Sequence, residues 1–216
     1  MNGKVTVGRC LARVGALCAA AMLLVATGCN LGLSAIPPVN VNINRVAAEL
    51  LAEYDSNKNG ALSRSELAAM PPLAECLSRC RRNANDEITE DELRATLKRI
   101  FDPRTAVVSA SCVVRRNGQP FAGAEVRFVP LPVFKNALPV GSGVTDVNGY
   151  AMIAASAKDL PSAAPNVALM TPGLYLVEVT HPSVQIPEKY NRQTVLGKEI
   201  STETVYGGRL AVDLKL

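Results

Sequence analysis

The sequence predicts an α + β protein of two domains, in which a helical N-terminal domain precedes an antiparallel β-sandwich of about seven strands. Three observations support this fold class. Apolar residues recur at spacings of three and four before residue 102, they alternate at every second position after residue 106, and two helix-start motifs precede the change. A chain of 216 residues is long enough for two small domains. The change of period places their junction near Asp102 to Thr105.

Residues 1–28 have the composition of an export signal. Their three basic residues precede an apolar stretch that is too short to span a bilayer comfortably, and the small residues before Cys29 resemble a bacterial lipobox. Lipidation of Cys29 would anchor the chain to a membrane without crossing it, whereas the alternative is an ordinary secretory signal that is cleaved nearby. Residues 29–43, with two prolines and little charge, are expected to form a tether. We therefore expect a membrane-anchored lipoprotein of the cell envelope, outside the cytoplasm.

The charge and residue types of the remaining chain argue against two function classes. Residues 1–28 hold three of the 23 basic residues and none of the 19 acidic ones, so the rest is nearly neutral and gives no electrostatic reason to expect nucleic acid. The only histidine, His181, precedes a proline at the end of a predicted strand, and the chain has no nucleophile-elbow motif. We therefore expect a protein that is not an enzyme, with His181 in a turn or on the surface.

Four helices are expected in the helical domain, residues 44–102. The first begins at residue 44. The second begins at the capping box "SRSE" of Ser63–Glu66 and ends before two prolines, and the third runs from Leu73 to about Arg81. The fourth begins at a second capping box, "TEDE", at Thr89–Glu92. The two capping boxes place a short polar loop before the second helix and another before the fourth.

The first loop, "DSNKNGALSRSE", has the pattern of a calcium site. Calcium takes six or more oxygen ligands, which a 12-residue loop between two helices supplies at set positions, with a glycine at position six for the sharp turn. Gly60 falls at position six, and the ligand positions one, three, five, seven, nine and twelve hold Asp55, Asn57, Asn59, Ala61, Ser63 and Glu66. Ala61 would offer its backbone carbonyl and Glu66 both carboxylate oxygens. This loop resembles the EF-hand family, which implies Ca²⁺ as the bound ion.

The second loop, "RRNANDEITEDE" at Arg81–Glu92, matches the same pattern only in part. Its residues at matching positions are Asn83, Asn85, Glu87 and Glu92. Ile88 corresponds to Leu62, the apolar residue through which paired loops meet. However, Arg81 replaces the first carboxylate and Asp86 replaces the glycine, and a cation at the first ligand position repels a metal ion. We therefore expect a degenerate structural partner that does not bind calcium.

The first site is expected to bind calcium weakly. Only Asp55 and Glu66 carry full negative charge, while Lys58 and Arg64 lie in the same loop. Fewer charged ligands lower the affinity, toward the ~10⁻⁴ to 10⁻³ M of extracellular modules. The expected role is the ordering of a small helical domain rather than signalling.

The C-terminal domain, residues 106–216, carries a second resemblance. The segments "VRRNGQPFAGAEVRFVP", "GVTDVNGYAMI", "PGLYLVEV" and "IPEKYN" occur in order. This ordered set resembles the transthyretin-like, carboxypeptidase regulatory-like domain of lipoproteins from planctomycete-type bacteria, which implies a non-catalytic sandwich in which Tyr190 packs against the sheet. The chain departs from that pattern at residues 192–200. We expect a closing hairpin formed by residues 200–206 and 210–216.

Two cysteines and the choice of function leave alternatives open. Cys76 and Cys80 share a helix face, so they are either bonded to each other or apolar core residues; zinc would require four ligands, and His181 is distant. The expected function is that of a non-catalytic calcium-binding structural or interaction lipoprotein with a protein partner in the envelope. The alternative is an accessory glycan- or peptide-binding module whose sandwich contacts the ligand.

Overall fold

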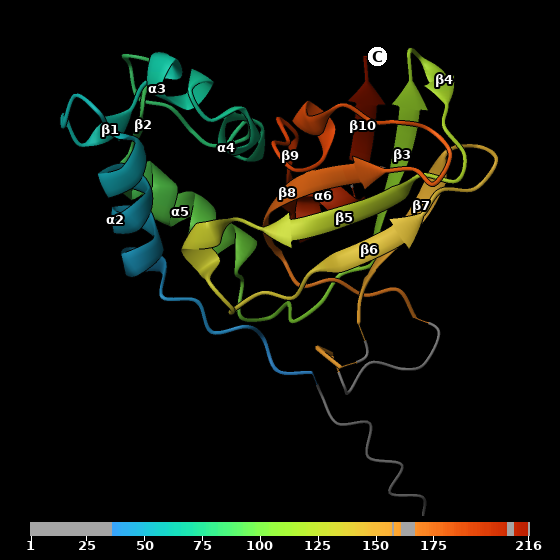
Figure 1. Ribbon diagram of the computed structural model, residues 1–216. Coiled ribbons are helices and arrows are strands. Elements are labelled where there is room, and N and C mark those ends of the chain that lie inside the picture. The colour runs from blue at the N-terminus through green and yellow to red at the C-terminus, as the bar shows by residue number, and fades with distance from the viewer. Residues whose placement is uncertain (1–35, 157, 161–166, 207–209, 216) are drawn as a thin grey trace, which may run out of the picture. The chain divides into compact units, whose positions relative to one another are not determined.

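The computed structural model describes residues 36–156, 158–160, 167–206 and 210–215. The predicted signal peptide and the lipidation residue Cys29 lie outside the described residues. In the described part, four helices precede a sheet of eight strands (Figure 1). None of the described helices is long and apolar enough to cross a membrane. The α + β class and the order of its two regions are as predicted, but one sheet of eight strands replaces the predicted sandwich of about seven.

The helices follow the predicted starts more closely than the predicted ends. They are α2 (Ile43–Tyr54), α3 (Arg64–Ala68), α4 (Pro71–Cys76) and α5 (Glu90–Ile100). Both capping boxes are present, at Ser63 and Thr89. The third helix begins at Pro71 rather than Leu73, because a proline in the first turn of a helix loses no hydrogen bond. It ends at Cys76 rather than near residue 81, and turns then lead into the second loop.

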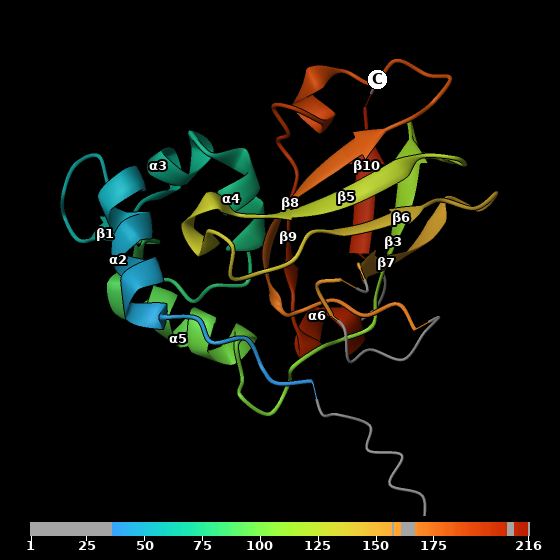
Figure 2. The same ribbon diagram turned by 60° about the horizontal axis from the view of Figure 1, so that its bottom comes forward.

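The sheet joins strands that are far apart in sequence. Its members are β3 (Ala110–Arg116), β4 (Gln119–Pro120), β5 (Glu125–Pro130), β6 (Gly141–Val144), β7 (Tyr150–Ala155), β8 (Gly173–Thr180), β9 (Gly197–Ile200) and β10 (Leu210–Leu214). The order is β10-β3-β7-β6-β5-β8-β9, and β4 pairs with β3. All neighbours are antiparallel except β10 and β3. Figures 1 and 2 show that β3 and β10 run steeply across the direction of β5 and β8, so the sheet curls into a half-barrel.

Alternating apolar side chains fill the inside of this curl. The alternation predicted for β3, β5 and β8 is confirmed, because Cys112 and Val114, Val126 and Phe128, and Val177 and Val179 are buried while the residues between them are less so. The largest of the buried side chains are Phe128 and Tyr175, whose rings meet edge to face at 6.3 Å between centroids. Tyr175 also keeps its hydroxyl group paired, with the Thr171 backbone carbonyl at 2.9 Å.

The predicted closing hairpin is wrong. Thr202–Tyr206 forms the helix α6 instead of a strand, and β10 does not pair with β9. It pairs in parallel with β3, at the opposite end of the sheet, where Val212 and Leu214 are each 1% exposed. A parallel neighbour needs a crossover rather than a tight turn, and the segment that contains α6 provides it.

The helical region packs directly on the edge strand β9. Gly197 has to be a glycine here, since a Cβ atom would lie 1.9 Å from the Pro72 carbonyl oxygen of α4. The Gly197 N–H donates to the Glu75 carboxylate at 2.8 Å, and Arg99 of α5 forms two bonds, of 2.7 and 2.9 Å, with Glu199. This contact covers an edge that would otherwise leave backbone groups unpaired.

Candidate metal centre

The first loop lies between α2 and α3 and is held against the second loop. The short strand β1 (Ala61–Leu62) pairs antiparallel with β2 (Ile88–Thr89), and Leu62 lies opposite Ile88 as predicted. Both of these apolar side chains are fully buried. The two loops therefore lie side by side at the same end of α2 and α5 (Figure 1).

Within the first loop, backbone N–H groups donate hydrogen bonds to side-chain oxygens of the same loop. One carboxylate oxygen of Asp55 accepts from the Gly60 N–H at 2.8 Å, and the other accepts from the Asn59 N–H at 3.2 Å. The side-chain oxygen of Asn57 also accepts from Asn59, at 2.9 Å, and that of Asn59 accepts from the Ala61 N–H at 3.0 Å. Gly60 has φ of +81°, a conformation that glycine adopts at little cost. The oxygens at positions one, three and five are thus oriented by the backbone.

Glu66, the last residue of the first loop, forms hydrogen bonds with residues at both ends of that loop. Its carboxylate accepts five hydrogen bonds: from the N–H and hydroxyl of Ser56, the N–H of Asn57, and the N–H and hydroxyl of Ser63. These donors, those of Ser63 first, lower the pKa of Glu66 to about 2 against its ordinary 4.5. Glu66 is only 7% exposed, whereas Asn57 and Asn59 are exposed.

The donor set of this loop suits a hard cation. All six predicted ligand positions lie in one continuous loop, and they offer carboxylate, amide, hydroxyl and carbonyl oxygens without histidine or thiolate. Calcium takes ligands of this kind, while zinc and copper prefer nitrogen and sulfur. Only Asp55 and Glu66 are charged ligands, and no group of three His, Cys, Asp or Glu side chains suited to a metal ion occurs among the described residues. The residues therefore fit calcium chemistry, at low ligand charge.

The second loop also has positive φ at position six, but it differs in its hydrogen bonds and at position four, where Lys58 has positive φ and Ala84 does not. The side-chain oxygen of Asn83 accepts from the N–H groups of Asn85 and Glu87, at 2.9 Å each. Asp86 has φ of +61° at the position that corresponds to Gly60. Glu92 accepts from the N–H and hydroxyl of Thr89 and so acts as a helix cap.

Two contacts between the loops were missed from the sequence. Arg64 of the first loop pairs with Asp86 of the second at 2.7 Å, and the side-chain N–H of Asn59 donates to the Glu87 carboxylate at 3.1 Å. The correspondence of Leu62 with Ile88 already implied that the loops are neighbours. It did not indicate which polar side chains would meet.

The cysteines are core residues. Cys76 and Cys80 are free and buried, so the disulfide alternative is wrong. Burial raises the pKa of the Cys76 thiol to about 12, and the pKa of Cys80 is raised in the same way. Neither cysteine belongs to a group of three His, Cys, Asp or Glu side chains suited to a metal ion among the described residues. Cys80 instead lies 3.0 Å from the Thr96 hydroxyl of α5.

Two residues singled out in the sheet region have structural surroundings. Tyr190 is 5% exposed, and its hydroxyl donates to the Lys215 carbonyl at 3.0 Å, which confirms the expected packing. His181 lies in the turn after β8. One of its ring nitrogens accepts from the Ser183 N–H, and the other lies 3.1 Å from the Ala122 carbonyl oxygen. Both ring nitrogens of His181 are therefore engaged with the backbone.

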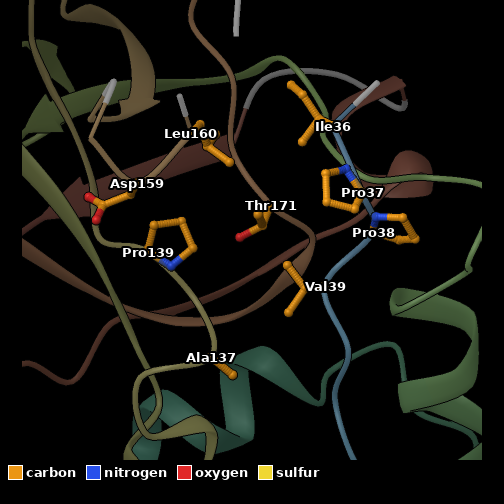
Figure 3. Close-up of a pocket in the computed structure, with 9 residues that line it drawn as sticks. All are labelled: Ile36, Pro37, Pro38, Val39, Ala137, Pro139, Asp159, Leu160 and Thr171. Carbon is orange, nitrogen blue, oxygen red and sulfur yellow. The ribbon is translucent and has the colours of Figure 1, made fainter. Parts of the chain in front are cut away.

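A separate hollow of about 360 Å³ lies beside the segment that precedes α2 (Figure 3). Its lining is mostly apolar: Ile36, Pro37, Pro38, Val39, Ala137, Pro139, Asp159, Leu160 and Thr171. Its two polar side chains have partners within the chain, since Asp159 accepts from the Ser156 hydroxyl at 2.7 Å and the Thr171 hydroxyl lies 2.8 Å from that of Tyr175. The hollow brings no set of polar groups together, so the first loop remains the stronger candidate site.

Comparison with known proteins adds no assignment. No protein-family model, no curated protein and no solved structure matches this chain.

Proposed function

We propose that this chain is a non-catalytic, calcium-binding structural or interaction lipoprotein of the cell envelope. In this proposal Asp55–Glu66 is an EF-hand calcium loop, Arg81–Glu92 is its degenerate partner, and the sheet is a transthyretin-like domain. The observation that carries the proposal is the first loop itself. Its oxygens recur at the required spacing, and those of Asp55, Asn57 and Asn59 are oriented by backbone N–H groups.

The hydrogen bonds of Glu66 support a weak site. Its carboxylate accepts hydrogen bonds from Ser56, Asn57 and Ser63, which compete with ligation of an ion. Ligation by Glu66 exchanges part of these bonds for the ion, so the net gain is small. Together with the low ligand charge, this favours an affinity in the range ~10⁻⁴ to 10⁻³ M. Such a site suits surroundings rich in calcium, where occupancy stabilises the fold.

The glycan-binding alternative lacks a comparable observation. A glycan site is expected to expose an aromatic platform, and no aromatic side chain that the structure describes is exposed. The large exposed apolar side chains of the described residues are five valines and one methionine. Calcium binding is therefore the better supported of the two functions.

A calcium titration followed by amide NMR tests the proposal. The full chain is stripped of metal and titrated with CaCl₂, with Asp55→Ala as the control variant. We expect saturable shifts at the amides of Asp55–Glu66, a single binding event, and loss of saturation in the variant. Equal behaviour of the wild type and Asp55→Ala contradicts the calcium assignment. A second saturable event at Arg81–Glu92 contradicts the degenerate partner.

A further inference from the structure

Two acidic side chains of the second loop form hydrogen bonds with side chains of the first loop. Asp86 accepts from Arg64 twice, from Nη2 at 2.7 Å and from Nε at 3.1 Å. Glu87 accepts from the side-chain nitrogen of Asn59 at 3.1 Å. These residues occupy positions six and seven of the second loop, where a calcium loop needs a glycine and a backbone carbonyl rather than acidic side chains. Neither acid is explained by calcium binding within its own loop.

Asp86 changes the charge balance of the first loop. That loop carries two acids, Asp55 and Glu66, against two cations, Lys58 and Arg64, so its formal charge is zero. An ion pair with Asp86 offsets one of the cations that oppose a divalent ion. The neighbouring Arg82 holds Asp86 in place, since it donates to the Asp86 carbonyl at 2.9 Å and lies 3.5 Å from its carboxylate.

Glu87 fixes the orientation of a predicted ligand. The amide of Asn59 is held at both ends, because its oxygen accepts from the Ala61 N–H while its nitrogen donates to Glu87. Glu87 is itself positioned by Asn83, whose amide oxygen accepts from the Glu87 N–H at 2.9 Å and whose amide nitrogen lies 3.4 Å from its carboxylate. Partners of this kind orient the residues that bind a metal and raise the negative charge on their oxygens.

We propose that the second loop, which no longer holds an ion, supports calcium binding by the first loop from outside. Asp86 offsets part of the charge of Arg64, and Glu87 is a positioning residue that fixes the side-chain amide of Asn59. The inference rests on the proposed calcium function of Asp55–Glu66. It assigns to Asp86 and Glu87 a role in affinity that is separate from the role of the second loop as a packing partner.

Calcium titrations of full-chain variants by amide NMR test this role. Glu87→Ala removes both the bond to Asn59 and the charge, and is expected to weaken binding about tenfold. Glu87→Gln keeps an acceptor for Asn59 and should weaken it about threefold. Asp86→Asn keeps a residue that tolerates positive φ and exposes the charge of Arg64, with a loss of about threefold that shrinks at high salt. The matched control is Asp91→Asn, because Asp91 is an exposed acid paired with an arginine of its own helix.

A double-mutant cycle isolates the charge effect. If Asp86 acts through Arg64, the Asp86→Asn change should have little effect on calcium affinity in a chain that already carries Arg64→Gln. Thermal unfolding in chelator is the second readout, because a purely structural role would lower the unfolding temperature of the calcium-free chain together with the affinity. We expect changes of affinity without such a loss of stability.

The outcomes separate the two proposals. A wild-type chain whose first loop shows no saturable response to calcium overturns the proposed function, and this inference falls with it. A wild-type chain that binds, together with Glu87 and Asp86 variants that match Asp91→Asn, overturns only the inference. Losses of affinity that merely follow losses of calcium-free stability also overturn it.

Discussion

The two loops of the helical region share a residue with positive φ at position six and a capping box at their end, but they differ in the hydrogen bonds between. In the first loop, Asp55 accepts from two N–H groups and Glu66 from several more. In the second, Arg81 stands at the first position, and Asn83 accepts the bonds that shape the turn. Both loops have a residue with positive φ at position six and end in a capping box. The loop conformation therefore does not depend on a full set of metal ligands.

This difference distinguishes the residues that hold the two loops and their helices together from the residues that are predicted to bind a metal ion. The second loop keeps the features that hold the helices together, namely the Leu62–Ile88 pair and the cap formed by Thr89 and Glu92. Its departures from the first loop fall at the predicted ligand positions and at position six. Matched substitutions at corresponding positions of the two loops therefore test which residues contribute to the free energy of unfolding in the absence of calcium.

The largest expected effect compares the two closing glutamates in calcium-free protein. Glu66→Ala removes an acceptor that serves both ends of its loop, whereas Glu92→Ala removes one that bonds only with Thr89. We expect a loss of about 3 kcal/mol in the free energy of unfolding for Glu66→Ala and about 1 kcal/mol for Glu92→Ala. Urea unfolding with chelator measures both. Equal losses would mean that the bonds of Glu66 with Ser56 and Asn57 contribute nothing.

A smaller effect is expected from the charge of Glu66 alone. Its pKa is lowered in the folded chain to about 2, from an ordinary 4.5, by the donors around it. The stabilisation by the charged form is therefore complete above pH 4.5 and is lost as the pH falls through about 2. The unfolding temperature of calcium-free wild type should exceed that of Glu66→Gln at pH 7, and the gap should close between pH 4.5 and 2. A gap that is constant over this range would contradict the role of the charge.

Much of this comparison could be predicted from local sequence, and the rest could not. The capping boxes and the alternating strands follow from spacings within short segments, and the Leu62–Ile88 pairing follows from the resemblance of both loops to one family. The contact of Arg64 with Asp86 depends instead on side-chain conformations in two loops, and these two residues are 22 positions apart in sequence. The parallel placement of β10 beside β3 likewise depends on where the chain crosses the sheet, and no local pattern encodes that path.

The smallest expected effect concerns the turn position. Gly60 and Asp86 occupy corresponding places with φ of +81° and +61°, and a Cβ atom added at Gly60 would meet no atom within 4 Å. Gly60→Ala should therefore cost about 1 kcal/mol of unfolding free energy, through backbone strain alone. Asp86→Gly relieves such strain but loses the exposed ion pair with Arg64, so its net effect should be smaller than that of Gly60→Ala.

Urea unfolding in chelator measures both turn variants. A loss for Asp86→Gly as large as that for Gly60→Ala would show that the ion pair with Arg64 contributes to stability as well as to calcium affinity. Because Gly60→Ala adds no clash, a cost well above 1 kcal/mol would instead mean that the first loop tolerates less change of backbone than the second. In that case the hydrogen bonds of Asp55 with Asn59 and Gly60, which have no counterpart at Arg81, would be the source of its rigidity.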